Sequence, residues 1–199
     1  MKTERVYREL LYRSLETDKT SFTQRKVASS CSISLGLVNF ALRPLRRMGA
    51  VQVRQNGFDV LDAWKVLMYW CSVRDLGRET VYSTLVDEPV HAIEANLPKD
   101  SIPTAYTAYK ERFGDAPADY SEVYVYGEKD RFVKRFGEGS SGGRRNMFIL
   151  GNDEHLSSLG RVPLAQMYAD LWNMETWYAR RFLDALGEKL KQMLPGETH

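Results

Sequence analysis

The sequence predicts an α+β protein with a helical N-terminal part that ends in a hairpin, followed by a small mixed α/β part with a long C-terminal helical segment. Three observations predict it. Residues 23–60 contain two helix starts, a helix stop and a tight turn; residues 81–150 alternate strand-like with helix-like segments; apolar residues recur at helical spacing over 163–194. A chain of 199 residues allows one large or two small domains.

The N-terminal part is predicted to contain three helices before the hairpin. Apolar residues place the first helix at residues 1–15. Thr23 can cap a second helix that runs to Ser30, because its hydroxyl can accept a backbone N–H of the first turn. Ser34 can cap a third helix that runs to about Met48 in the same way. Residues between the second and third helices then form a tight turn.

A hairpin is predicted directly after the third helix. Gly49 ends that helix, residues 51–54 alternate apolar and polar side chains, and Asn56-Gly57 favours a two-residue turn before residues 58–60 return. Helix, turn, helix and hairpin in this order are typical of a winged helix-turn-helix.

The third helix is the candidate for reading DNA. Its core-facing residues are predicted to be Val38, Ala41, Leu42 and Leu45. On the other face, the small Ser34 and Gly36 permit close approach, Asn39 can pair with a base edge, and Arg43 can reach a guanine or a phosphate. The predicted DNA-contacting residues are Lys26, Ser34, Gly36, Asn39, Arg43, Arg46, Arg47 and Arg54.

Positive charge concentrates in this same region, although the whole chain has a formal net charge of only +2. No acidic residue lies between Asp18 and Asp59. The basic residues there are Lys19, Arg25, Lys26, Arg43, Arg46, Arg47 and Arg54. A local basic face predicts double-stranded DNA as the partner, because its phosphates attract clustered lysine and arginine.

A winged helix that contacts only proteins is the competing interpretation. It is favoured by the apolar Leu35, Leu37 and Phe40 near the outer face, and by Pro44, which removes one hydrogen bond inside the third helix. After the hairpin, a helix beginning near Asp62 is apolar around much of its circumference. Such a helix must be covered, so it is expected to pack on the first part, on a second copy in a homodimer, or on both.

The domain boundary is predicted at the polar Gly77-Arg78-Glu79, which gives a DNA-binding domain over 1–76 and a regulatory or interaction domain over 77–199. In the second domain, the expected strands are 81–86, 122–126 and 146–150. The expected helices are 89–96, 103–114 and 163–194, the last with a break near 173–175. Residues 129–136 fit neither pattern clearly.

The second domain offers weak chemical motifs. Residues 137–145 are glycine-rich and end in two arginines, which can cradle phosphate, but a solvated connection is the favoured interpretation because no Gly-Lys-Ser/Thr ending follows. Asp153 follows a strand and could bind a metal in an enzyme acting on nucleic acid or nucleotides. We favour Asp153 as a helix cap instead. The sequence therefore predicts no catalytic residue, cofactor or metal site, and a protein that is not an enzyme.

Two further residue types bear on fold and location. Asp170 lies among aromatic residues of the last helical segment, so it is expected to pair with Arg161, Arg180 or a tyrosine hydroxyl. Cys31 and Cys71 lack metal-binding spacing and are expected to be reduced. No apolar run approaches the roughly 20 residues that span a bilayer. We expect a cytoplasmic protein with no membrane partner.

The chain also resembles a known family. The stretch SISLGLVNFALRPLRRMGAV over 32–51 is similar to winged helices of bacterial and archaeal transcriptional regulators. The order IPTAYTAYKERFG, SEVYVYGE, NMFILGNDEH and RVPLAQMYADLWNMETWYARRFLDAL resembles AbiEi-type antitoxins of type IV toxin–antitoxin systems. In that family a proline-led segment, here Val162-Pro163-Leu164, leads into a helix with an Asp-Leu pair, here Asp170-Leu171.

The resemblance implies a repressor that binds inverted repeats in its own promoter. It also implies a toxin as partner protein, with the second domain counteracting that nucleotidyltransferase. A regulator without a toxin, carrying a domain of the same type, fits the sequence equally well.

Overall fold

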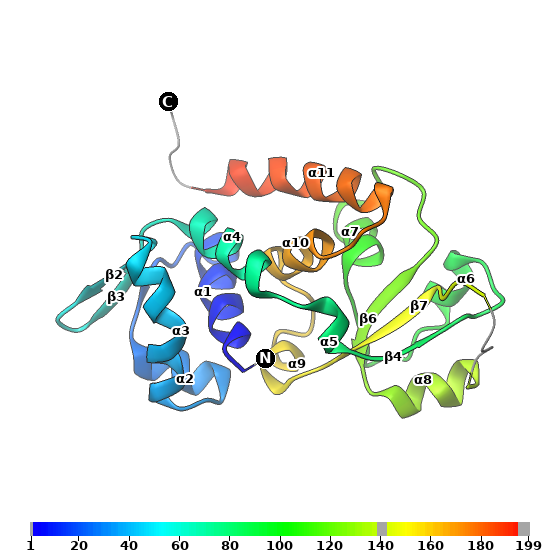
Figure 1. The fold of residues 1–199 in the computed structure, drawn as a ribbon, viewed down its shortest axis with the longest axis horizontal. Coiled ribbons are helices and arrows are strands. Elements are labelled where there is room, and N and C mark those ends of the chain that lie inside the picture. The colour runs from blue at the N-terminus through cyan, green and yellow to red at the C-terminus, as the bar shows by residue number, and fades with distance from the viewer. Residues whose placement is uncertain (1, 139–142, 195–199) are drawn as a thin grey trace. The chain divides into compact units, whose positions relative to one another are not determined.

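The computed structural model describes residues 2–138 and 143–194, which form a mixed α+β fold with a helix near the C-terminus (Figure 1). The chain divides into two compact units. Unit 1 comprises Met1–Arg74, Pro163–Ala169 and Leu186–His199, and unit 2 comprises Asp75–Val162 and Asp170–Ala185. The sequence-based boundary after residue 76 places two C-terminal segments in the second domain, whereas these segments group with unit 1.

Unit 1 contains the predicted helices and hairpin in the predicted order. Its elements are α1 (Glu4–Glu16), β1 (Ser21–Phe22), α2 (Gln24–Cys31), α3 (Leu35–Arg47), β2 (Val51–Arg54), β3 (Gly57–Val60) and α4 (Ala63–Val73). Both predicted caps are confirmed, since the Thr23 hydroxyl accepts the Lys26 N–H at 3.3 Å and the Ser34 hydroxyl accepts the Leu37 N–H at 3.2 Å.

The small sheet of unit 1 has the order β1-β3-β2, with both pairings antiparallel. Strand β1 is absent from the sequence-based prediction, because two residues carry no period and only pairing with β3 defines them. The turn also differs from the prediction: Gln55 and Asn56 make it, and Gly57 begins β3. A Cβ on Gly57 would lie 2.2 Å from the Phe22 carbonyl oxygen, so glycine is needed where β1 passes.

The core of unit 1 is built around α1, which packs against α2, α3 and α4. The predicted inner residues of α3 are all buried: Val38, Ala41, Leu42 and Leu45. The C-terminal segment 163–169 joins this core, because the Glu16 carboxylate accepts the Leu164 N–H at 2.8 Å and the Tyr168 ring lies 5.7 Å from that of Trp64. These contacts link residues about a hundred or more positions apart, which no local pattern reveals.

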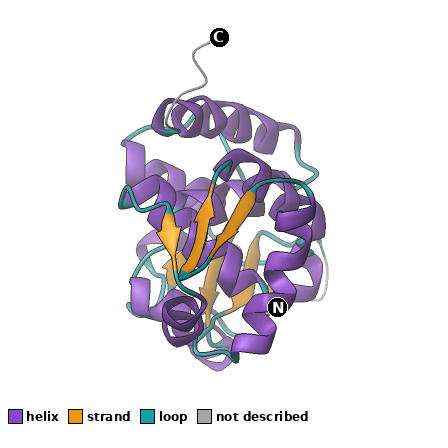
Figure 2. Cartoon of the chain, turned by 90° about the vertical axis from the view of Figure 1, so that its left-hand side faces the viewer, coloured by secondary structure: helices purple, strands orange, loops and turns teal. Residues whose placement is uncertain are grey.

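Unit 2 alternates short helices and strands. Figure 2 shows the helices of the chain in purple and its strands in orange. The elements of unit 2 are α5 (Leu76–Glu79), β4 (Thr80–Thr84), α6 (Val90–Ala95), β5 (Ile102–Pro103), α7 (Ala105–Phe113), β6 (Val123–Gly127), α8 (Lys129–Phe136), β7 (Met147–Gly151) and α9 (Glu154–Leu159). Helices α10 (Leu164–Trp172) and α11 (Trp177–Met193) contribute residues to both units. The predicted break near 173–175 is confirmed, since it separates α10 from α11.

The sheet of unit 2 has the order β4-β7-β6-β5, in which only β6 and β7 run parallel within the described residues. One face carries a hydrophobic cluster of Val86, Ile93, Val123, Val125, Phe132, Met147 and Ile149. Residues 77–79, the predicted polar junction, form most of α5, which Asp75 caps through the Arg78 N–H at 3.0 Å. The first break between units 1 and 2 lies just before this helix, after Arg74. In the described part of the chain, no helix is long and apolar enough to cross a membrane.

Candidate nucleic-acid interface

The exposed residues of α3 are Leu35, Gly36, Phe40, Arg43 and Arg47, of which the last four form one stripe. Steps of four, three and four residues place these positions one above another along a helix. Burial of the opposite face in the core of unit 1 fixes this orientation, so the stripe is directed to solvent. We call these four residues the α3 stripe.

Two arginines of the α3 stripe are available to a bound polyanion. Arg43 and Arg47 are exposed, and within residues 2–138 and 143–194 neither takes part in an ion pair. Their charges are therefore not neutralised by any residue that the structure describes. Lys26 on α2 is exposed as well and adds to the same basic unit.

Asn39 and Arg46 lie beside the stripe and contact each other. Both are half-buried, and the Arg46 guanidinium donates to the Asn39 side-chain oxygen at 3.1 Å. Asn39 would need both its acceptor and its donor for a bidentate contact with adenine. Because its oxygen already accepts from Arg46, the structure leaves chiefly its NH₂ group for a base.

The hairpin arginine is also engaged. Arg54 is exposed but forms an ion pair with the Asp59 carboxylate, which accepts the Ser21 hydroxyl at 2.7 Å. The Ser21 hydrogen bond, and after it the Arg54 guanidinium, hold the pKa of Asp59 below its usual range. Asp59 thus stays charged near neutral pH and offsets part of the Arg54 charge. The alternation of side chains along the hairpin places residues 54 and 59 on the same face of the sheet, so this contact follows from the strand pattern.

Gly36 lies in open space on α3 among the described residues. A Cβ built on it would meet only the Ser34 hydroxyl oxygen, at 3.9 Å, and its backbone φ is not in the left-handed region. Glycine inside a helix costs about 1 kcal/mol relative to alanine. The open space beside Gly36 leaves the backbone of the first turn of α3 accessible from solvent. The Ser34 hydroxyl, by contrast, is occupied as the cap of α3.

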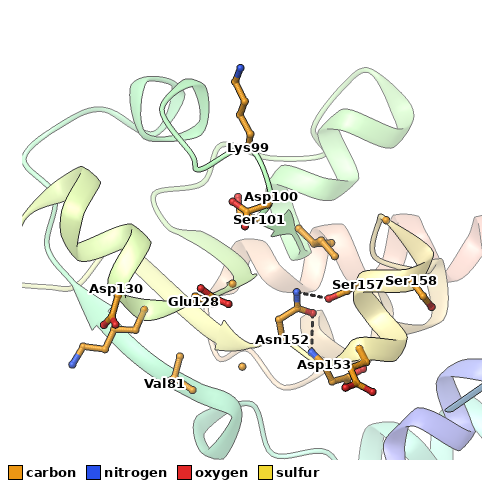
Figure 3. A pocket seen from close by; sticks show the side chains of 16 residues that line it. Val81, Lys99, Asp100, Ser101, Glu128, Asp130, Asn152, Asp153, Ser157 and Ser158 are labelled. Carbon is orange, nitrogen blue, oxygen red and sulfur yellow. Dashed lines mark hydrogen bonds between the residues drawn. The ribbon is translucent and has the colours of Figure 1, made fainter. Parts of the chain in front are cut away.

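Unit 2 contains a separate cleft of about 1180 Å³ at the carboxyl ends of β6 and β7 (Figure 3). Acidic side chains line it, including Asp100, Glu128, Asp130, Asp153 and Glu154. The carboxyl ends of parallel strands are where α/β proteins place ligands. The cleft is therefore where a metal-dependent enzyme site would lie if the chain had one.

Asp153 in this cleft is a helix cap, as the favoured interpretation predicted. Its carboxylate accepts the Leu156 N–H of α9 at 2.9 Å. Its neighbour Asn152 donates to the Ser157 hydroxyl at 3.0 Å and accepts the Asp153 N–H at 2.8 Å. Dashed lines mark both bonds in Figure 3. Among the residues that the structure describes, no three His, Cys, Asp or Glu side chains gather to hold a metal.

The two arginines of the glycine-rich stretch contact protein groups. Arg144 donates to the buried Glu122 carboxylate at 2.8 Å, and Arg145 bonds the backbone carbonyl and hydroxyl of Ser83. Residues 139–142 of the predicted loop lie outside the described residues. The arrangement favours the interpretation of residues 137–145 as a connection between elements.

Comparison with models of known protein families, with curated proteins and with solved structures finds no match for this chain.

Proposed function

We propose that this protein binds double-stranded DNA through unit 1 as a sequence-specific transcriptional regulator of the winged helix-turn-helix type. The element order α1-β1-α2-α3-β2-β3 supports the proposal, together with a sheet in which β1 pairs with β3. In this arrangement α3 is the recognition helix and the β2–β3 hairpin is the wing.

The α3 stripe is the observation that carries the proposal. A helix that enters the major groove must present one open face, with groups that match both base edges and phosphates. The stripe presents a glycine near its start, two arginines without ion pairs among the described residues, and no carboxylate. A protein-contacting face has no comparable need for uncompensated positive charge next to a helix glycine.

Selection of bound sequences from random duplex DNA tests the proposal directly. We expect a recurrent motif, and binding that weakens steeply as salt rises, because phosphate contacts release counterions. If the regulator acts as a two-fold dimer, the motif will be an inverted repeat with half-sites about one helical turn apart. Failure to enrich any motif, with no salt-dependent binding to duplex DNA, would contradict the proposal.

Replacing Arg43 should weaken binding to the preferred site more than binding to random DNA, whereas replacing Arg54 should weaken binding to both equally. Arg43 lies in the middle of the α3 stripe, so Arg43→Ala should weaken binding to the selected site by about tenfold, or about 1.4 kcal/mol. Arg54→Ala should lower the affinity for both DNAs to the same degree, and by less than about tenfold, because Asp59 already offsets the charge of Arg54. Fluorescence anisotropy at fixed salt measures all four affinities, and equal losses for Arg43→Ala would remove it from the base-reading residues.

Gly36→Ala should separate stability from DNA binding. Alanine fits the open space and favours the helix, so the free energy of unfolding should rise by about 0.5 to 1 kcal/mol. The added methyl group should hinder close approach and lower DNA affinity by about tenfold, or about 1.4 kcal/mol. Urea unfolding and anisotropy give the two values. Ser72→Ala, at an exposed position of α4, is the control and should leave DNA affinity unchanged; unaltered binding by Gly36→Ala would show that nothing approaches the helix there.

A further inference from the structure

We propose that Phe40 reads the C5-methyl group of thymine in the major groove of the bound site. The inference rests on the proposed DNA-binding function and adds a specificity-determining residue to it. It assigns a role to a large apolar side chain that the core of unit 1 does not use.

The exposure of Phe40 is the first observation. Its side chain is 60% exposed, the largest exposure of an apolar residue on α3. It lies one turn after Gly36 and three residues before Arg43, in the middle of the α3 stripe. Whatever covers the stripe must therefore accept an aromatic ring at its centre.

The charges around Phe40 select the kind of partner. Arg43 and Arg47 follow it on the same stripe, and neither forms an ion pair within the described residues. A partner that covers the ring must also supply negative charge on the same side of it. Duplex DNA does so, because phosphates flank the groove on both sides.

The major groove then limits what the ring can contact. Hydrogen-bond donors and acceptors dominate the base edges there, and the C5-methyl of thymine is the apolar group that each A·T pair presents. A phenyl ring cannot hydrogen-bond to the polar edges, but it can bury a methyl group. Close approach at Gly36 brings the next turn of the helix, and with it Phe40, toward the base edges.

Replacing thymine by uracil in the selected site removes the methyl group and changes nothing else on that base edge. Burial of one methyl group contributes about 0.8 kcal/mol, so we expect at least one position where this replacement weakens wild-type binding about fourfold. Phe40→Ala should bring the ratio of the two affinities at that position close to one. Met48→Ala changes an exposed apolar residue just beyond α3 and should leave the ratio near four.

Each outcome decides between interpretations. No uracil effect at any position in wild-type protein would overturn the inference and leave sequence-specific binding intact. A fourfold effect that persists in Phe40→Ala would also overturn it, because another group would then contact the methyl. If Phe40→Ala binds weakly, lower salt strengthens its phosphate contacts and allows the ratio to be measured. Absence of any DNA binding by wild-type protein would remove the proposed function as well.

Discussion

Replacing Glu4 by alanine should lower the free energy of unfolding by about 3 to 5 kcal/mol, the largest effect expected in unit 1. Glu4 is buried in α1, where its carboxylate accepts the Trp70 indole N–H at 2.9 Å and forms an ion pair with Arg74. Arg74 is buried too, so water cannot replace the Glu4 carboxylate beside the Arg74 guanidinium after the substitution. Urea unfolding of the two proteins measures the difference.

A matched substitution on the surface should have little effect. Lys65→Ala removes the exposed ion pair with Asp62 and leaves the Asp62 cap on α4 in place. An exposed pair of this kind contributes less than about 1 kcal/mol. A loss for Glu4→Ala no larger than that for Lys65→Ala would show that the buried pair does not stabilise the fold.

The contribution of Glu4 should depend on pH. Burial alone would raise the pKa of Glu4, but the Arg74 charge and the Trp70 hydrogen bond outweigh it and hold the pKa below its ordinary value of 4.5. A lowered folded-state pKa means that the stabilisation is fully present above about pH 4.5 and disappears as the pH falls through the folded-state value. The stability difference between wild type and Glu4→Gln should therefore shrink below that pH.

Replacing Asp170 by alanine should lower the free energy of unfolding by about 3 kcal/mol, the largest effect expected in unit 2. Asp170 is fully buried and accepts the Thr104 hydroxyl at 2.6 Å and the Tyr126 hydroxyl at 2.7 Å. The prediction that Asp170 pairs with a tyrosine hydroxyl is therefore confirmed by Tyr126. Alanine would deprive both hydroxyls of this acceptor inside the core and leave a small cavity.

Asp170→Asn is the control for this prediction. The amide keeps one oxygen that can accept from a hydroxyl, so its loss in urea unfolding should be clearly smaller than that of alanine. Equal losses for the two variants would mean that charge, and not the number of acceptors, is what these hydroxyls require. Asp184→Ala, which removes an exposed pair with Arg180, should change stability by less than about 1 kcal/mol.

Local patterns predicted much of unit 1 because each pattern corresponds to a physical requirement within a few residues. Thr23 and Ser34 can accept backbone N–H groups that would otherwise lack a partner at a helix start. The apolar spacing of Val38 and Leu42 predicts which face of α3 is buried, and therefore which face is open. The same spacing is enough to place Phe40 and Arg43 on or near the outer face, because both positions follow from the helical period alone.

Patterns failed where a partner distant in sequence decides the outcome. β1 is too short to carry a period and exists through β3, and Gly57 is required by the backbone of β1. The bond between Arg46 and Asn39 and the ion pair between Arg54 and Asp59 join residues close in sequence, and helical and strand periods place each pair on one face. Asn39, Arg46 and Arg54 of the predicted site already bond to other protein groups, which a ligand would have to displace or share.

By itself, the sequence determined the helix caps, the buried face of α3, the hairpin and the basic composition of the first sixty residues, because these follow from hydrogen bonding and hydrophobic spacing along the chain. Only the tertiary structure decided that residues 163–169 complete the core of unit 1, that Asp170 serves two hydroxyls, and which arginines keep their charge unpaired among the described residues. The physical reason is the same in each case: burial and ion pairing depend on which atoms meet in space, and folding brings together residues that no local period connects.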